Sequence, residues 1–154
     1  MSVDQDLSKV KPQVYPSKIN VPYSWWAGDT AARFFAGLSE KRIEATRCEC
    51  CNKVFAPPRK TCPECFAACQ TWVDLALTGT VTGFTVARAA RAAMGGRKLP
   101  AVFALVKLDG ADTALLHVIG GCAPGDVRIG MRVKARFAEE PAGGILDILY
   151  FEPV

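Results

Sequence analysis

The 154-residue sequence has a single histidine and no long apolar run. Its longest uncharged stretches, residues 75–87 and 113–125, each contain 13 residues, whereas a membrane-spanning helix needs about 18 or more. The first residues, MSVDQDLSKVKPQ, lack the apolar core and the small-residue cleavage site of a secretory signal. We therefore expect a soluble protein with a cytoplasmic location.

The sequence also lacks the motifs of common catalytic sites. It contains no G-x-S-x-G elbow, no G-x-x-x-x-G-K-[ST] phosphate loop and no strand-linked G-x-G-x-x-G. The adjacent acidic residues Glu139 and Glu140 precede Pro141 in an expected loop, and His117 lies in an apolar segment. No nucleophile stands beside a base, so we expect no catalytic residue in this chain.

A strong charge of one sign is absent as well. The 19 Lys and Arg residues against 15 Asp and Glu give a formal net charge of +4. This mild excess is compatible with an anionic small ligand but is weaker than that of a dedicated nucleic-acid binder. Apolar residues make up 50% of the chain and charged residues 22%, a balance that supports a globular core.

Cysteine, in contrast, is abundant and clustered, with six of the seven cysteines between residues 48 and 69. Cys48 and Cys51 form one C-x2-C pair, and Cys62 and Cys65 form a second pair ten residues later. Two such pairs can surround one ion while backbone N–H groups donate to the sulfurs. Four thiolates leave no open coordination position, so the pattern predicts a structural Zn²⁺.

Other interpretations of the cysteines stay open at this point. Cys50 or Cys69 could replace a neighbour as a ligand, and four cysteines can also hold an iron–sulfur cluster. A thioredoxin-like redox pair is less favoured, because two C-x-x-C units occur without a βαβ pattern. The isolated Cys122 is interpreted as a small, partly buried residue rather than a nucleophile.

The composition divides the chain into three parts. Residues 1–47 are predicted to form an extended arm and a docking helix, residues 48–72 the zinc ribbon, and residues 73–154 a β domain. The last part carries five short segments rich in β-branched and aromatic residues, which suit a five-stranded barrel of the OB type, although a small sandwich would fit equally. The segments are Thr80–Val86, Ala101–Leu108, Thr113–Ile119, Met131–Phe137 and Ile145–Phe151.

The arm and helix are rich in aromatic residues. Three prolines within residues 1–22 favour an extended backbone, and a helix is expected between Tyr23 and Arg47, with Asp29 as its N-cap. A stripe of residues four apart suggests one apolar face: Trp26, Thr30, Phe34 and Leu38. A helix this short depends on whatever it packs against. That surface is either the rest of this chain or a partner protein.

The order of these motifs resembles a known family of small proteins. An aromatic-bearing helix precedes RCECCNKVFAPPRKTCPEC, which is followed by TWVDLALTGTVTGFTV, LPAVFALVKLDG, IGMRVKARF and a closing YFEP. In this family a rubredoxin-like zinc ribbon precedes an OB-fold, and the proteins are associated with acyl-CoA chemistry. The resemblance runs from about residue 25 to the end of the sequence. Asn52 stands where the family usually has Gly, and Asn tolerates the left-handed backbone.

The resemblance implies a non-catalytic accessory subunit in a hetero-oligomer with a thiolase-like catalytic subunit. In such assemblies the small protein helps to bind or pass on a CoA thioester, while the chemistry belongs to the other chain. Because guanidinium groups bind phosphates well, basic residues near a groove are candidate CoA-binding residues, unless they are only solvated loop charges. The candidates are Arg59, Lys60, Arg88, Arg91, Arg97 and Lys98.

Single-stranded nucleic-acid binding is the alternative function, because zinc ribbons and OB barrels both occur in nucleic-acid proteins. That function needs exposed aromatic side chains beside a basic groove. The aromatic residues of the β segments are mostly expected in the core instead: Phe84, Phe103, Phe137, Tyr150 and Phe151.

Overall fold

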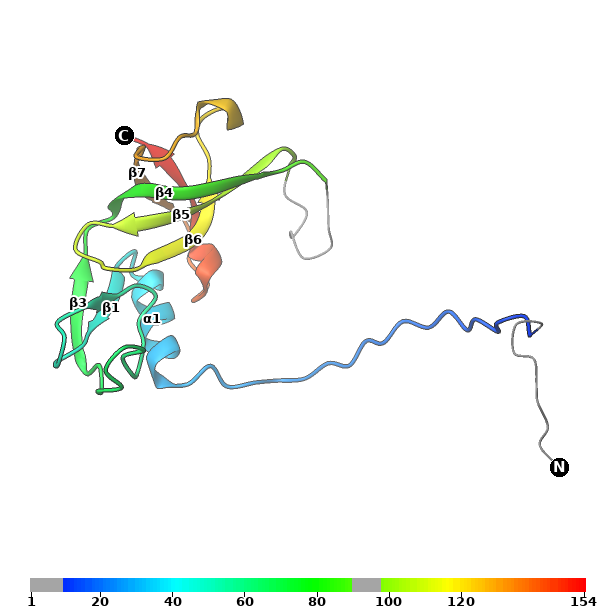
Figure 1. Cartoon of the computed structure of the whole chain (residues 1–154), viewed down its shortest axis with the longest axis horizontal. Helices are drawn as coiled ribbons and strands as arrows, with labels where there is room; N and C mark the ends of the chain where they lie inside the picture. Colours follow the sequence, from blue (N-terminus) through cyan, green and yellow to red (C-terminus); the bar gives the residue numbers. More distant parts are fainter. Residues whose placement is uncertain (1–9, 90–97) are drawn as a thin grey trace.

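The structure, a computed structural model, describes residues 10–89 and 98–154. Residues 10–28 contain no helix or strand and leave the body as a long arm (Figure 1). The aromatic side chains of the arm are exposed; Trp25 and Trp26, for example, keep 73% and 78% of their surface. The arm therefore does not build a core with the rest of the chain.

Helix α1 (Asp29–Ser39) follows the arm and differs from the prediction at both ends. Its N-cap is Gly28 rather than Asp29, which lies in the first turn, where its negative charge complements the helix dipole. The helix ends at Ser39 because Lys41 adopts a left-handed backbone (φ 60°) and its N–H donates to the carbonyl of Leu38. The expected helical region up to Arg47 is therefore wrong after Ser39. Of the predicted stripe, only Phe34 and Leu38 are buried.

A three-stranded antiparallel sheet carries the cysteine loops. Its order is β2 (Val54–Phe55), β1 (Ile43–Arg47) and β3 (Thr71–Leu75), with β1 in the centre. The sheet crosses both predicted boundaries of the ribbon, because it begins before residue 48 and ends after residue 72. Strand β1 thus pairs with the ribbon, although the sequence pattern placed it in the helical part.

The remaining strands close into a five-stranded barrel in the order β4-β5-β6-β8-β7, which confirms the OB-type prediction over the sandwich. Strand β8 runs parallel to β6, and the other pairs are antiparallel. In Figure 1 the barrel lies above α1 and the small sheet. The strands are β4 (Thr78–Ala87), β5 (Ala101–Leu108), β6 (Ala114–Ile119), β7 (Arg132–Phe137) and β8 (Ile148–Pro153).

Strand β8 begins at Ile148, clearly later than the predicted start at Ile145. Residues Ile145–Asp147, which were predicted to begin this strand, form the short helix η4 instead. The Asp147 carboxylate accepts hydrogen bonds from the backbone N–H groups of Ala142, Gly143 and Gly144. These bonds organise the turn and delay the strand.

The barrel core follows the alternation of the strands. On β7 the side chains of Val133 and Ala135 are buried and those of Arg132 and Lys134 are exposed, as the sequence pattern predicts. Among the aromatic residues expected in the core, Phe151 is fully buried. Phe84 is 40% exposed, so the expectation that it lies in the core is wrong. His117 is buried on β6, and its Nε2 lies 3.2 Å from the Ile145 carbonyl oxygen.

The seam between β4, β5 and β7 depends on a close approach of backbones. Gly79 pairs with Leu108 on one side and with Val133 on the other. A Cβ atom at residue 79 would lie 2.6 Å from the carbonyl oxygen of Lys107. Next to this point, the Asp109 carboxylate accepts hydrogen bonds from the Arg132 guanidinium, which hold the pKa of Asp109 well below its usual range.

We predict that Gly79→Ala destabilises the fold by about 1–3 kcal/mol, because the added methyl group overlaps backbone atoms that cannot move alone. Urea unfolding followed by circular dichroism measures this change. Gly125→Ala is the matched control, since a Cβ there meets no atom within 4 Å. Equal unfolding midpoints for the two variants would show that the seam tolerates the extra volume.

Within the residues that the structure describes, no helix combines the length and the apolar character that a bilayer span requires.

Candidate metal centre and its surroundings

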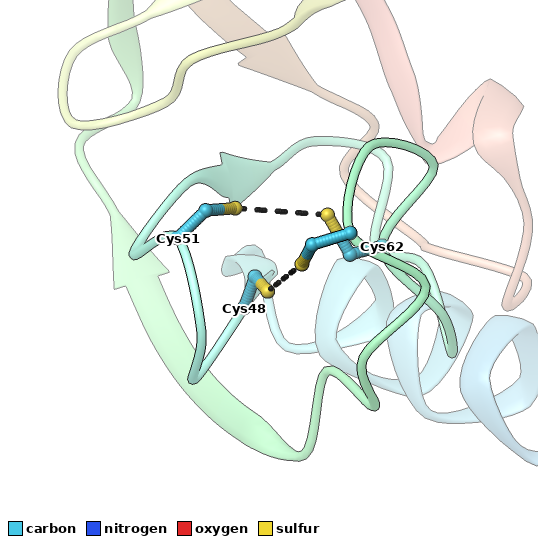
Figure 2. A group of neighbouring side chains, drawn as sticks. Cys48, Cys51 and Cys62 are labelled. Carbon is cyan, nitrogen blue, oxygen red and sulfur yellow. Dashed lines mark hydrogen bonds between the residues drawn. The ribbon is translucent and has the colours of Figure 1, made fainter.

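The four predicted cysteine ligands converge on one point. The sulfurs of Cys48, Cys51, Cys62 and Cys65 all lie within 4.8 Å of one another. Cys48 Sγ is 3.3 Å from Cys65 Sγ, and Cys51 Sγ is 3.6 Å from Cys62 Sγ. Figure 2 shows the side chains of Cys48, Cys51 and Cys62 pointing toward one another. Zn–S bonds of about 2.3 Å in a tetrahedron place the sulfurs about 3.8 Å apart. The four sulfurs therefore fit a tetrahedral zinc ion.

The two cysteine pairs lie in two separate turns that have the same backbone conformation. After the second cysteine of each pair, one residue takes a left-handed conformation: Asn52 and Phe66 both have φ 59°. The tolerance expected for Asn52 thus applies to a turn that uses this conformation twice. In both turns the left-handed residue donates its backbone N–H to the carbonyl oxygen of the first cysteine. The N–H of the first cysteine in turn donates to the carbonyl oxygen of the residue that follows the left-handed one. The bonds are Asn52 to Cys48, Cys48 to Lys53, Phe66 to Cys62 and Cys62 to Ala67.

The same turns favour thiolates at the first position of each pair. Backbone N–H groups, first that of Cys51 and then that of Cys50, lower the pKa of Cys48 to about 6 in spite of its burial. The N–H of Cys65 lowers the pKa of Cys62 in the same way. Because thiolates are the form that binds metals, the first cysteine of each pair is prepared for a cation. The pKa values of Cys51 and Cys65 are raised instead.

The extra cysteines do not join this group. Cys50 is exposed, and Cys69 is buried beside the cluster but outside the four converging sulfurs. Burial raises the pKa of Cys69 to about 11, which favours its thiol form. Cys122 is partly buried and packs against the barrel core. The arrangement therefore supports the predicted set of four over sets that include Cys50 or Cys69.

Hydrogen bonds attach the ribbon to the barrel. The carboxylate of Asp112 accepts the N–H of Val54 at 2.8 Å, and the backbone N–H of Asp112 donates to the Val54 carbonyl at 2.8 Å. The Thr113 hydroxyl accepts the N–H of Ala56 at 2.8 Å and donates to its carbonyl at 3.0 Å. The turn after β5 thus fixes the ribbon against the barrel.

The basic candidates fall into two separate places. Arg59 and Lys60 lie in the ribbon, whereas Arg88 and Lys98 lie near the ends of β4 and β5, in a different part of the barrel. All four are exposed. The structure therefore does not bring the predicted set together, and Arg91 and Arg97 lie outside the described residues.

Lys60 borders a depression of about 720 Å³ between the start of α1 and the ribbon, which we call the basic depression. Arg33, Trp26 and Trp72 also line it. The Arg33 guanidinium lies 4.2 Å from the centre of the Trp72 ring and 2.9 Å from the Glu44 carboxylate. Sequence reasoning missed Arg33 and Trp72, because only the packing of α1 on β1 and β3 brings them beside Lys60.

Lys98 borders another depression, of about 690 Å³, together with Cys122 and Tyr150. It contains no second cation among the described residues.

The outer face of β5 and β6 bears on the nucleic-acid alternative, because OB-folds bind oligonucleotides on the equivalent strands. On this face Leu105 is paired with Leu116 and Phe103 with Val118. Lys107 is the one charged residue among the outward positions of these two strands, and Phe103 is the one aromatic residue. This face therefore offers neither the stacking platform nor the basic groove of that function.

These features define the chain as a ribbon with four converging cysteines joined to an OB barrel. Residues 72–138 match the family described as "ChsH2, C-terminal OB-fold domain". A DUF35 domain-containing scaffold protein of Methanocaldococcus jannaschii is 30% identical over 113 residues, which cover 70% of this chain and 79% of that protein. The chain belongs to the DUF35 family, and the resemblance predicted from its motifs is confirmed.

Further similarities extend to enzyme subunits. A protein of Thermomonospora curvata, described as a probable enoyl-CoA hydratase alpha subunit, is 32% identical over 108 residues, or 70% of this chain. The present chain spans only 33% of that protein's length.

Two solved structures are also similar. The structure titled "Ltp2-ChsH2(DUF35) aldolase" superposes with a TM-score of 0.65 at 29% identity, covering 82% of this chain and 95% of that one. A DUF35 protein of unknown function from Sulfolobus solfataricus, at 23% identity and a TM-score of 0.62, covers 82% of this chain and 87% of that one and shows the same fold.

We predict that the purified chain contains one zinc ion, and that Cys62→Ser removes it because three thiolates close the site incompletely. Elemental analysis and far-UV circular dichroism measure metal content and folding. Cys50→Ser is the control, because its exposed side chain lies outside the cluster. A coloured protein with stoichiometric iron would contradict zinc, and a Cys62→Ser variant with full zinc content would contradict the ligand set.

Proposed function

We propose that this chain is a non-catalytic accessory subunit of an enzyme complex that acts on acyl-CoA thioesters, with a thiolase-like catalytic subunit as its partner. The observation that carries the proposal is the arm of residues 10–28, whose large apolar side chains stay exposed beside a folded body. Such a surface is expected to be covered by another protein. The names of the relatives, a scaffold protein and an enoyl-CoA hydratase subunit, support the proposal.

In this proposal the four cysteines hold Zn²⁺, which contributes folding free energy and takes no part in the reaction. The chemistry belongs to the partner in this proposal. His117, the single histidine of the sequence, is buried inside the barrel domain.

The basic depression is the better of the two candidate places for the phosphate-bearing end of CoA. Lys60 supplies an exposed cation there, and Arg33 supplies a second one that is paired with Glu44. Trp72 and Trp26 supply aromatic surface, and Asp29 is the one acidic residue of the lining. The other place contains only Lys98 among the described cations. Charged donors next to aromatic rings suit a phosphorylated ligand with a planar base.

The arm should be required for assembly. We predict that deleting residues 1–28 abolishes binding to the thiolase-like subunit and leaves the zinc content unchanged. The deletion stops before α1, because Phe34 and Leu38 belong to the core and their loss would unfold the chain. Co-expression with the candidate catalytic subunit, followed by size-exclusion chromatography, measures assembly. Intact assembly of the truncated chain would contradict a docking role for the arm.

Lys60 should contribute to CoA binding. We predict that Lys60→Glu weakens CoA binding roughly tenfold, as expected when a charge-assisted hydrogen bond is lost. Isothermal titration of the zinc-loaded chain with CoA measures the change, and Lys107→Glu, at an exposed site on β5, is the control. Weakened binding in Lys98→Glu but not in Lys60→Glu would move the phosphate site to the other depression.

A further inference from the structure

A second groove lies on the opposite side of α1 from the basic depression, and nothing described so far uses it. It has a volume of about 440 Å³ and lies where the helix, the ribbon and the barrel meet. We call it the apolar groove. Its walls are formed mainly by Phe34 and Phe35 of α1, Pro57 and Pro58 of the ribbon, and Leu115 and Leu116 of β6.

All side chains that line the groove are apolar, and its rim continues onto the barrel surface. Leu116 keeps 60% of its surface exposed and is paired on the outer sheet face with Leu105, which keeps 44%. A single exposed leucine needs no explanation, but a cavity that continues into an apolar strand face marks a binding surface. The volume lies within the range of about 300–1,000 Å³ that is typical of small-molecule sites.

The ribbon segment 57–60 links this groove to the basic depression. Pro57 and Pro58 line the apolar groove, and Lys60, two residues later, lines the basic depression. The backbone of Arg59 between them is fixed, because its N–H donates to the buried Thr46 hydroxyl, which in turn donates to the Arg59 carbonyl.

Helix α1 divides the two sites in the same way. Arg33 faces the basic depression, and the next two residues, Phe34 and Phe35, line the apolar groove. Helix α1 and the ribbon segment 57–60 thus each have the apolar groove on one side and the basic depression on the other. A ligand with a hydrocarbon part and an anionic part matches this division of charge.

We propose that the apolar groove binds the acyl group of the CoA thioester, as an aliphatic chain of medium length. The inference rests on the proposed function and adds to it the class of acyl group. The hydrocarbon would leave water in the groove, and the phosphates would stay near Lys60 and Arg33. Short acyl groups such as acetyl cannot fill the groove, so the binding free energy should grow with chain length.

The experiment is a titration of the zinc-loaded full chain with CoA, butanoyl-CoA and decanoyl-CoA. Each buried methylene should tighten binding by up to about fourfold. Because the groove is open, we expect decanoyl-CoA to bind at least about tenfold more tightly than butanoyl-CoA. Leu116→Glu should remove this difference, since it places a charge in the groove wall, and should leave CoA binding unchanged. Ile129→Glu is the matched control, because Ile129 keeps 67% of its surface and lies outside the groove.

The outcomes separate this inference from the proposed function. Equal affinities for all three ligands would overturn the acyl site and leave CoA binding in place. Absence of binding by every ligand would overturn both. If Leu116→Glu instead abolished self-association of the chain, or its assembly with the catalytic subunit, without a chain-length effect, the groove would be a protein interface. Folding of each variant is checked by its zinc content and circular dichroism spectrum.

Discussion

The ribbon depends on the convergence of its cysteine sulfurs, because it has almost no apolar core. The buried residues of its own cluster are Cys48, Phe55, Cys62 and Cys69. One aromatic ring cannot offset the conformational entropy lost when the residues of the ribbon become ordered. A structural zinc ion contributes about 10–16 kcal/mol of binding free energy in zinc-finger peptides, which is the scale that this segment needs. The proposed metal is therefore a condition for the shape of the ribbon, whereas the barrel has a core of its own.

That shape determines both candidate binding surfaces. The hydrogen bonds of Asp112 and Thr113 to the strand after the first cysteine turn hold the ribbon on the barrel. The following segment supplies one wall of the apolar groove and the Lys60 side of the basic depression. An inert metal can thus matter for ligand binding without touching the ligand, since it fixes the backbone that carries these walls.

The sequence predicted those features that follow from local spacing. Two C-x2-C pairs identify the converging sulfurs, and strict alternation identifies the buried face of β7, because neither depends on distant contacts. The end of α1 was missed, since the residue in the left-handed conformation is Lys41 rather than the usual Gly, so the stop signal is absent. The separation of Lys60 from Lys98 and the apolar groove were also missed, because they arise from elements far apart in the chain.

The arm and the basic depression share a residue, and this links assembly to ligand binding. Trp26 belongs to the arm, yet it lines the depression beside Lys60. If the arm docks on the catalytic subunit, the indole of Trp26 takes the position that the interface requires. The shape of the basic depression then changes, because Trp26 is part of its wall. A ligand that favours one position of Trp26 then favours the same state of the arm, and the coupling acts equally in both directions. Thioester binding and assembly with the enzyme would then be coupled, and the sign of the coupling would depend on whether ligand and enzyme favour the same position of Trp26.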